Sequence, residues 1–326
     1  MLVMVGSSNA AVGMARGMSI LRDGGSALDA VEETVRLVES NPQDHTVGLG
    51  GLPNLLGVVE LDASIMDGHT LDAGAVGGIT GFEHPISIAR RVMEDLPHAL
   101  LVGSGAERFA RECGFEPADL LTPEARRMYE QGLTGDMPRG GRYANAILRA
   151  LAAHLAADPE RAAGKDTGTV NVLALDARGH LAAGVSTSGF AWKYPGRVGD
   201  SAVIGAGNYC DDRYGAAACT GRGEMAIRAA TAHSLVLHLR RGLSVEEAGQ
   251  TALAELDRLV DPFWSAMSTV ALSPDGRHAA FSTAKDSTYV FMNEASARPE
   301  KALRIHVPVA GTRNRPASSE SPSGAP

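Results

Sequence analysis

One segment, residues 169–186, constrains the fold of this chain more than any other. It is predicted to form a strand over 169–175, a turn over 176–179 and a returning strand over 180–186. Both faces of the first strand are mostly apolar, which is typical of a strand that is covered on both sides. The chain therefore needs packed layers above and below this hairpin.

A second hairpin is predicted over 267–283, with its turn at Pro274-Asp275-Gly276. Between the two hairpins we expect a long helix over 224–241 and another helix from Ser244 to about Val260, which a Ser244–Glu247 capping box would start. Sheets with helices between and after them indicate an α+β protein with layers of helix, sheet, sheet and helix. This is one of several arrangements that such an order of elements allows.

The first half of the chain alternates between helical and extended patterns. Its clearest helix follows Ser26, where Leu28, Val31, Val35 and Val38 recur at spacings of three and four residues. We further expect strands over 57–63 and 98–102 and helices over 85–95, 105–113 and 143–157.

The domain organisation is predicted to be simple. Residues 1–309 would form a single domain, with a surface excursion over 114–142 where prolines and glycines interrupt any period. Residues 310–326 are rich in Ser, Pro, Gly and Ala, and we expect a disordered tail there.

Composition excludes several classes of partner. The net charge is −8, the sequence contains no basic run and aromatic residues make up 5%, so neither nucleic acid nor an anionic membrane is expected as a partner. No apolar stretch approaches the roughly 18 residues that span a bilayer. The start of the chain lacks the basic region of a signal peptide, and three widely spaced cysteines suit reduced thiols, so a cytoplasmic protein is expected.

The histidines and cysteines do not show metal-ligand spacing. The ten histidines contain no His-x-x-x-His pair and the cysteines no Cys-x-x-Cys pair. We therefore expect neither a metal site nor a cofactor, and a small molecule as the substrate.

Four features that could carry chemistry cluster within about fifty residues. In chain order they are Gly168-Thr169, Ser186-Thr187-Ser188-Gly189, the Arg197 and Asp200 pair in a glycine-rich turn, and Cys219-Thr220-Gly221-Arg222-Gly223-Glu224. Each has an ordinary structural explanation, as a β-forming residue, a solvated ion pair or a helix cap. Their combination in this order is far more specific than any one of them.

With these motifs, the chain resembles the N-terminal-threonine (Ntn) hydrolases that include glycosylasparaginase, plant-type L-asparaginase and isoaspartyl peptidase. The similarity covers about residues 1–290. It includes Gly24-Gly25-Ser26-Ala27-Leu28-Asp29-Ala30-Val31-Glu32, Val47-Gly48-x-Gly50-Gly51-x-Pro53, Asp166-Thr167-Gly168-Thr169-Val170, Pro195-Gly196-Arg197-Val198-Gly199-Asp200-Ser201 and Cys219-Thr220-Gly221-x-Gly223-Glu224.

The resemblance implies an αββα sandwich that is made as an inactive precursor. The precursor would cleave itself into residues 1–168 and 169–326, and two copies of each fragment would assemble. Cleavage frees an α-amine with an unperturbed pKa of roughly 7.7–8.0, which can take the proton of a nucleophilic hydroxyl at neutral pH.

Thr169 best matches the nucleophile because it starts the strand in the register that the family motif has. Thr167 is the alternative, since Asp166-Thr167 resembles the junction that glycosylasparaginases cut. Gly168 before the cut resembles the isoaspartyl peptidases, and a glycine there can adopt a strained backbone without a side-chain cost.

The remaining roles follow the same resemblance. Thr187 would hydrogen-bond the nucleophile and its amine, and Thr46 matches a small hydroxyl residue near the nucleophile. Thr220 and Gly221 match the oxyanion hole, which we expect at the start of the following helix.

Arg197 matches the group that binds the α-carboxylate of the substrate, for which a guanidinium fork is suited. Asp200 matches the partner of the substrate α-ammonium. The expected substrate is therefore asparagine, an N4-substituted asparagine or, alternatively, a β-aspartyl (isoaspartyl) peptide.

The chain also departs from the family, and other classes of function remain open at this stage. Residues 5–9 lack the aromatic side chain that glycosylasparaginases place near the chain start, and residues 262–266 lack the double glycine of the isoaspartyl branch. The alternatives are a nucleotide-binding module using the glycines of 205–207 and 221–223, a cysteine amidase using Cys219, and an uncleaved inactive homologue.

Overall fold

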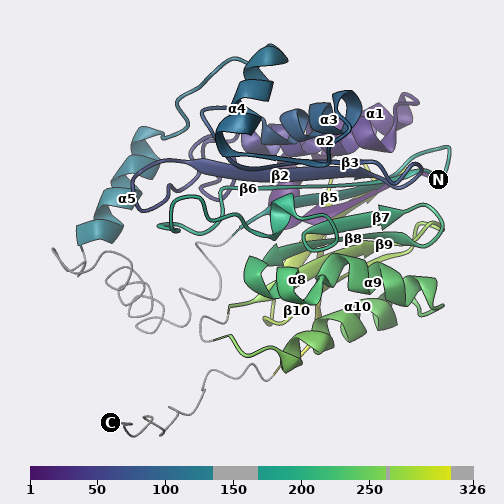
Figure 1. Ribbon diagram of the computed structural model, residues 1–326. Coiled ribbons are helices and arrows are strands. Elements are labelled where there is room, and N and C mark those ends of the chain that lie inside the picture. Colours follow the sequence, from purple (N-terminus) through teal and green to yellow (C-terminus); the bar gives the residue numbers. More distant parts are fainter. Residues whose placement is uncertain (135–167, 262–264, 310–326) are drawn as a thin grey trace, which may run out of the picture.

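Two β-sheets stack face to face, and helices cover the outer side of each sheet (Figure 1). The computed structural model describes residues 1–134, 168–261 and 265–309. In the larger sheet the strand order is β12-β11-β1-β5-β6-β2-β3-β4, and in the smaller one it is β13-β10-β9-β8-β7. Pairing is antiparallel except for β3 with β4 and β10 with β13.

The strands of the larger sheet are β1 (Val3–Ser7), β2 (Glu60–Asp67), β3 (Ala73–Thr80), β4 (Leu100–Val102), β5 (Val170–Leu175), β6 (Leu181–Thr187), β11 (Thr288–Asn293) and β12 (Glu300–Leu303). Those of the smaller sheet are β7 (Asn208–Asp211), β8 (Gly215–Gly221), β9 (Met267–Leu272), β10 (His278–Ser282) and β13 (Ile305–His306).

The α-helices are α1 (Ala11–Arg22), α2 (Ala27–Glu39), α3 (Pro85–Asp95), α4 (Gly103–Glu112), α5 (Pro123–Thr134), α8 (Gly223–Ala229), α9 (Thr231–Arg240) and α10 (Val245–Ala254). Short 3-10 helices are η1 (Ser8–Ala10), η2 (Asp200–Ala202) and η3 (Glu255–Arg258). Among the residues placed in the structure, no helix is both long and apolar enough to cross a membrane.

Three apolar layers hold the four structural layers together. One lies between the larger sheet and helices α1 to α4, and a second lies between the smaller sheet and helices α8 to α10. The third lies between the two sheets, where β5 and β6 contact β8. The predicted α+β class and αββα sandwich are confirmed, and the apolar pattern of 169–175 is explained, because every residue of β5 is buried.

The sequence did not indicate β1, which pairs with β5 and β11 at the middle of the larger sheet. Gly6 interrupts its apolar pattern. A Cβ at Gly6 would lie 2.6 Å from the carbonyl oxygen of Asn171 and 2.8 Å from the Ala10 side chain, so the two strands meet here only because this residue has no side chain.

The helix predicted over 224–241 is wrong as a single element. It is divided into α8 and α9 at Ala230, whose backbone is left-handed, with φ of 48° and ψ of 49°. Beyond the break, the N–H of His233 donates to the carbonyl of Gly205 at 2.8 Å, so α9 begins against that loop rather than continuing α8. Helical periodicity cannot reveal a break that such a contact stabilises.

Other boundaries differ less. The strand expected over 57–63 is β2, and α10 ends at Ala254, after which the chain continues as η3. The excursion over 114–142 contains α5, which sequence reasoning missed. The hydroxyl of Tyr129 on α5 donates to the carbonyl of Leu55 at 3.0 Å. The helix predicted over 143–157 and the tail predicted over 310–326 lie outside the described residues.

Packing of α1 against α2 yields a test of the fold. A Cβ on Gly13 of α1 would overlap the backbone of Thr34, whereas a Cβ on Gly105 of α4 would meet no atom of the described residues within 4 Å. Gly13→Ala should lower stability, because overpacking against backbone typically costs about 1–3 kcal/mol and exceeds the gain in helix propensity. Gly105→Ala should be neutral or stabilise by up to about 1 kcal/mol. Urea unfolding of both variants measures the difference, and equal effects would contradict the packing.

Candidate active site

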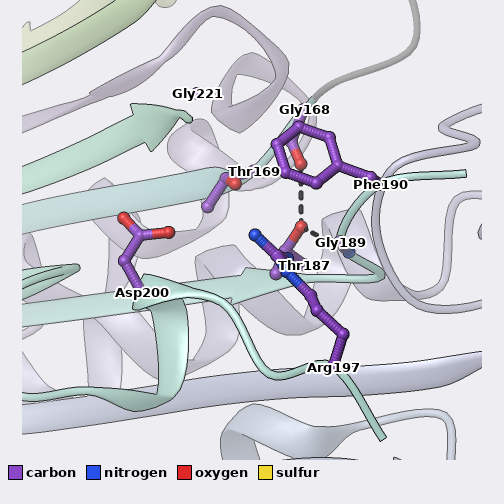
Figure 2. A pocket seen from close by; sticks show the side chains of 8 residues that line it. All are labelled: Gly168, Thr169, Thr187, Gly189, Phe190, Arg197, Asp200 and Gly221. Atoms are coloured by element: carbon purple, nitrogen blue, oxygen red, sulfur yellow. Dashed lines mark hydrogen bonds between the residues drawn. The ribbon is translucent and has the colours of Figure 1, made fainter. Parts of the chain in front are cut away.

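The ends of three buried strands meet at one edge of the two sheets. Thr169 precedes β5, Thr187 ends β6 and Gly221 ends β8. Together with the loop that follows β6 they line a small cavity that is partly open to solvent. Figure 2 shows the residues that line it, which are Gly168, Thr169, Thr187, Gly189, Phe190, Arg197, Asp200 and Gly221.

Thr187 contacts the peptide bond at which cleavage is predicted. Its hydroxyl donates to the carbonyl oxygen of Gly168 at 2.8 Å, and that oxygen belongs to the bond between Gly168 and Thr169 (Figure 2). The backbone N–H of Gly189 donates to Thr187 Oγ1 at 2.9 Å and so fixes the hydroxyl in place. The arrangement polarises the carbonyl group that a nucleophile from Thr169 would attack. The alternative nucleophile, Thr167, lies outside the described residues.

Thr46 lies on the other side of Gly168. A Cβ at position 168 would overlap the Thr46 side chain, so the chain passes this point only as glycine. The Thr46 hydroxyl donates to Asp44 Oδ1 at 2.6 Å, which fixes the orientation of this side chain. Thr46 is therefore close to the predicted cleavage site, as expected, although it is not among the residues that line the cavity.

Arg197 enters the cavity from the loop after β6. Its guanidinium lies 4.6 Å from the centre of the Phe190 ring and its Nε donates to Glu224 Oε1 at 3.0 Å. These contacts hold the guanidinium in one orientation and leave part of its donor fork for a ligand. The structure places Arg197 at the cavity, and sequence reasoning missed Phe190 and Glu224 as the groups that orient it.

Asp200 is an almost fully buried carboxyl group in the 3-10 turn η2, with 5% of its surface exposed. Its Oδ2 has no hydrogen-bond partner among the described residues. Burial raises the pKa of Asp200 to about 6, although the nearby Arg197 acts in the opposite direction. A buried carboxyl with a free acceptor atom facing a cavity is suited to receive a cationic group.

Two acidic side chains of β2 hold the loop that carries Arg197 and Asp200. Glu60 Oε1 accepts from the N–H of Gly196 at 2.8 Å, and Asp62 Oδ2 accepts from the N–H of Gly199 at 2.9 Å. Sequence reasoning missed both acids, because carboxylates on a strand ordinarily face solvent. Their burial marks them as functional or structural partners, and this burial is visible only in the folded structure.

Thr220 corrects one expectation. It lies at the end of strand β8, paired with Ser268 on β9, and not at the start of a helix, since α8 begins at Gly223. Its Oγ1 accepts a hydrogen bond of 2.7 Å from the side-chain amide of Asn171. Because that oxygen is the acceptor, the hydroxyl hydrogen of Thr220 is left to donate elsewhere.

Asn171 is itself fixed by the start of the chain. The N–H of Ser7 donates to Asn171 Oδ1 at 2.9 Å, and the N–H of Asn171 donates to Ser7 Oγ at 3.0 Å. Asn171 is fully buried, so both ends of its amide are committed to hydrogen bonds. The residues 5–9 that lack an aromatic side chain thus contribute to the site through Ser7, a role that sequence reasoning missed.

The alternative sites find no support in the geometry. Cys219 is fully buried, and burial raises the pKa of its thiol well above the ordinary value, which disfavours a nucleophilic thiolate. A Cβ on Gly207 would overlap the backbone oxygen of Asp200, so this glycine allows close backbone packing rather than a phosphate cradle.

The fold and the site define a four-layer αββα hydrolase architecture with a threonine at the start of a central strand, facing an arginine and an aspartate. Residues 8–301 match the model of the asparaginase family. The chain belongs to that family.

Individual relatives carry three names. A plant-type L-asparaginase of Pyrococcus furiosus is 39% identical over 86% of this chain and 87% of its own. An isoaspartyl peptidase/L-asparaginase of Mus musculus is 40% identical over 73% of this chain and 67% of its own. An N(4)-(beta-N-acetylglucosaminyl)-L-asparaginase of Elizabethkingia miricola is 38% identical over 74% and 65%.

The buried carboxyl group predicts how stability depends on pH. The pKa of Asp200 is about 6 in the folded protein against an ordinary value of 3.8, so the folded state holds this proton more tightly. Its contribution to stability is present below about pH 4 and is lost as pH rises through 6. Asp200→Asn should therefore stabilise the protein at pH 7.5, by on the order of 3 kcal/mol, and much less at pH 4.5.

Urea unfolding of wild type and Asp200→Asn at the two pH values measures this difference. Asp119→Asn, at an exposed loop position, is the control and should show little change at either pH. A wild type that is more stable than Asp200→Asn at pH 7.5 would contradict the assignment of a strained buried carboxyl.

Proposed function

We propose that this chain is a self-processing amidohydrolase in which Thr169 is the nucleophile and asparagine or an N4-substituted asparagine is the substrate. One observation carries the proposal. The Gly168–Thr169 bond lies in the same cavity as Arg197 and Asp200, and the hydroxyl of Thr187 is bonded to the carbonyl of that bond.

Maturation would use the same side chains as catalysis. The hydroxyl of Thr169 attacks the carbonyl carbon of Gly168, and the hydrogen bond from Thr187 stabilises the charge that develops on the oxygen. The acyl group moves from the nitrogen to the hydroxyl oxygen of Thr169, and water hydrolyses the resulting ester. Residue 169 then begins a new chain, with its own amine as the general base.

Turnover follows from the two charged groups. The guanidinium of Arg197 binds the α-carboxylate of the substrate, and the carboxylate of Asp200 accepts from its α-ammonium. With both α-groups held, the side-chain amide faces Thr169. The amine of Thr169 takes the hydroxyl proton, the oxygen attacks the amide carbon, and Thr220 and Gly221 donate to the oxyanion. The leaving nitrogen takes the proton, and water releases aspartate from the β-aspartyl ester.

The identity of the leaving group distinguishes an asparaginase from an isoaspartyl peptidase. The clamp recognises only the aspartyl part of a substrate, so it suits ammonia, a glycosylamine or a peptide as leaving group equally. The names of the relatives include all three kinds of enzyme. Rates of aspartate release from asparagine, from N4-(β-N-acetylglucosaminyl)-asparagine and from a β-aspartyl dipeptide, measured side by side, assign the substrate.

The proposal includes an assembly, in the cytoplasm, of two copies of fragment 1–168 with two copies of fragment 169–326. Support for the compartment comes from the cysteines, which are all free thiols, two of them buried. Support for the assembly comes from the family resemblance.

Cleavage is the first test. Thr169→Ala should leave one uncut chain, because no hydroxyl is available to attack the carbonyl of Gly168. Thr167→Ala, two residues earlier, is the matched control and should still yield fragments 1–168 and 169–326. Intact-mass spectrometry distinguishes the products. Cleavage of Thr169→Ala, or a new amino terminus at Thr167 in the wild type, would refute Thr169 as the nucleophile.

The contact between Asn171 and Thr220 gives a second test. Thr220→Val keeps the side-chain shape and removes one oxyanion donor, which should lower kcat by roughly 10²–10³ with little change in KM. Asn171→Ala should lower kcat by a smaller factor, because it releases Thr220 without deleting the hydroxyl.

A double-mutant cycle shows whether Asn171 acts through Thr220. In a Thr220→Val background, Asn171→Ala should cause no further loss of kcat. Steady-state kinetics on the processed single and double variants measure kcat and KM, and unfolding curves verify that each variant is folded. Fully multiplicative losses would show that Asn171 acts independently, and a loss confined to KM would make Thr220 a binding residue.

A further inference from the structure

Three hairpin turns meet at the end of the sheets opposite the cavity. They connect β2 to β3, β5 to β6 and β7 to β8. Because β5 has six residues, this end lies roughly 20 Å from Thr169. The turns contribute His69, His180 and Asp212, whose ligand atoms all lie within 4.8 Å of one another.

The carboxylate of Asp212 is the centre of this group. Its Oδ2 lies 2.8 Å from His180 Nδ1 and 3.4 Å from His69 Nδ1. The two imidazole rings contact each other, with centroids 4.1 Å apart and planes inclined by 51°. Three separate turns thus bring two imidazole rings and one carboxylate close together.

Backbone hydrogen bonds hold the three turns together. Asp212 Oδ1 accepts from the N–H of Leu181 at 2.7 Å, which orients the carboxylate so that Oδ2 faces the histidines. The N–H of Asp212 donates to the carbonyl of Gly68 at 2.9 Å. The N–H of Gly68 donates to the carbonyl of Leu181 at 2.8 Å. A metal-ligating carboxylate is commonly oriented in this way through its second oxygen.

We propose that His69, His180 and Asp212 bind a divalent transition-metal ion, with Zn²⁺ as the expected occupant. Zinc binds imidazole nitrogen and carboxylate oxygen at about 2.0–2.2 Å, so two ligands on a tetrahedral ion lie roughly 3.3–3.5 Å apart. The separation of 3.4 Å between His69 Nδ1 and Asp212 Oδ2 fits that geometry, whereas the 2.8 Å between His180 Nδ1 and Asp212 Oδ2 is a hydrogen-bond distance that a bound ion would have to widen.

The surroundings favour a cation with an open coordination position. The recess beside the histidines is also lined by Asp67 and Asp176, and Arg178, the basic residue that lines it within the described part of the chain, is paired with Asp176 at 3.0 Å. His69 is 62% exposed, so water can reach the fourth position of the ion. The bound ion would link three turns that lie far from the cavity, and it would stabilise the fold without taking part in amide hydrolysis.

Sequence spacing gave no sign of this site, because its three ligands come from three different turns and none of them forms a short metal-binding motif. The expectation that the chain has no metal site rested only on such motifs. The three residues lie far apart in the sequence, and only the fold brings them together.

The experiment titrates Zn²⁺ into the tag-free full-length protein by isothermal titration calorimetry. Wild type should bind one Zn²⁺ per chain. His69→Ala, His180→Ala and Asp212→Asn should each weaken the affinity at least roughly 100-fold, since even loss of an outer partner of a ligand costs 10–100-fold. His98→Ala, at an exposed histidine outside the group, is the control and should bind as wild type does.

Thermal unfolding gives a second readout. Zn²⁺ should raise the Tm of wild type and of His98→Ala, because it binds the folded state, and should leave the Tm of Asp212→Asn unchanged. Asp212→Asn keeps the shape and the acceptor for Leu181, so it separates loss of metal from misfolding. Absence of binding by wild type, or binding retained by any of the three ligand variants, overturns the proposal and leaves a hydrogen-bonded His–Asp cluster.

Discussion

The hydrogen bond from Thr187 to the carbonyl of Gly168 is the interaction on which the functional site depends. It exists because β5 and β6 form a hairpin whose two open ends lie side by side at one edge of the larger sheet. Strand β5 is buried on both faces, so it cannot shift without disturbing the apolar layers on its two sides. A rigid hairpin therefore presents a peptide bond to a hydroxyl group, and we propose that this bond is the one cut.

The buried carboxyl group of Asp200 is energetically unfavourable in the folded protein. Asp200 is buried with one oxygen unpaired, and burial raises its pKa to about 6. Glu60 and Asp62 hold the loop that carries it through backbone N–H groups and so keep the carboxyl in an unfavourable place. A ligand with an α-ammonium group would relieve that cost. An unfavourable buried group of this kind is typical of a binding site that is arranged for a charged ligand.

Sequence reasoning predicted the αββα layers, both hairpins and the family, and it placed Thr169, Arg197 and Asp200 in one site, because local periodicity and ordered motifs survive in the sequence. It failed where tertiary contacts decide. The contact between the loop at Gly205 and α9 accompanies a break at Ala230 that periodicity did not show. Thr220 was expected at the start of a helix, although it is the last residue but one of strand β8. Asn171 looked like an ordinary strand residue, but its side-chain amide accepts from Ser7 and donates to Thr220, so it supports Thr220.

The central claim is that the hydroxyl of Thr169 forms an ester with the substrate. The most direct measurement is to mix the processed enzyme with asparagine, quench in acid within the first turnovers and map the adduct by peptide mass spectrometry. The account predicts a β-aspartyl group on the peptide that begins at Thr169, and its absence from an Asp200→Ala protein that still cleaves itself. An adduct on Cys219 or on Thr187, or turnover with no acyl-enzyme under conditions that trap such esters, would contradict it.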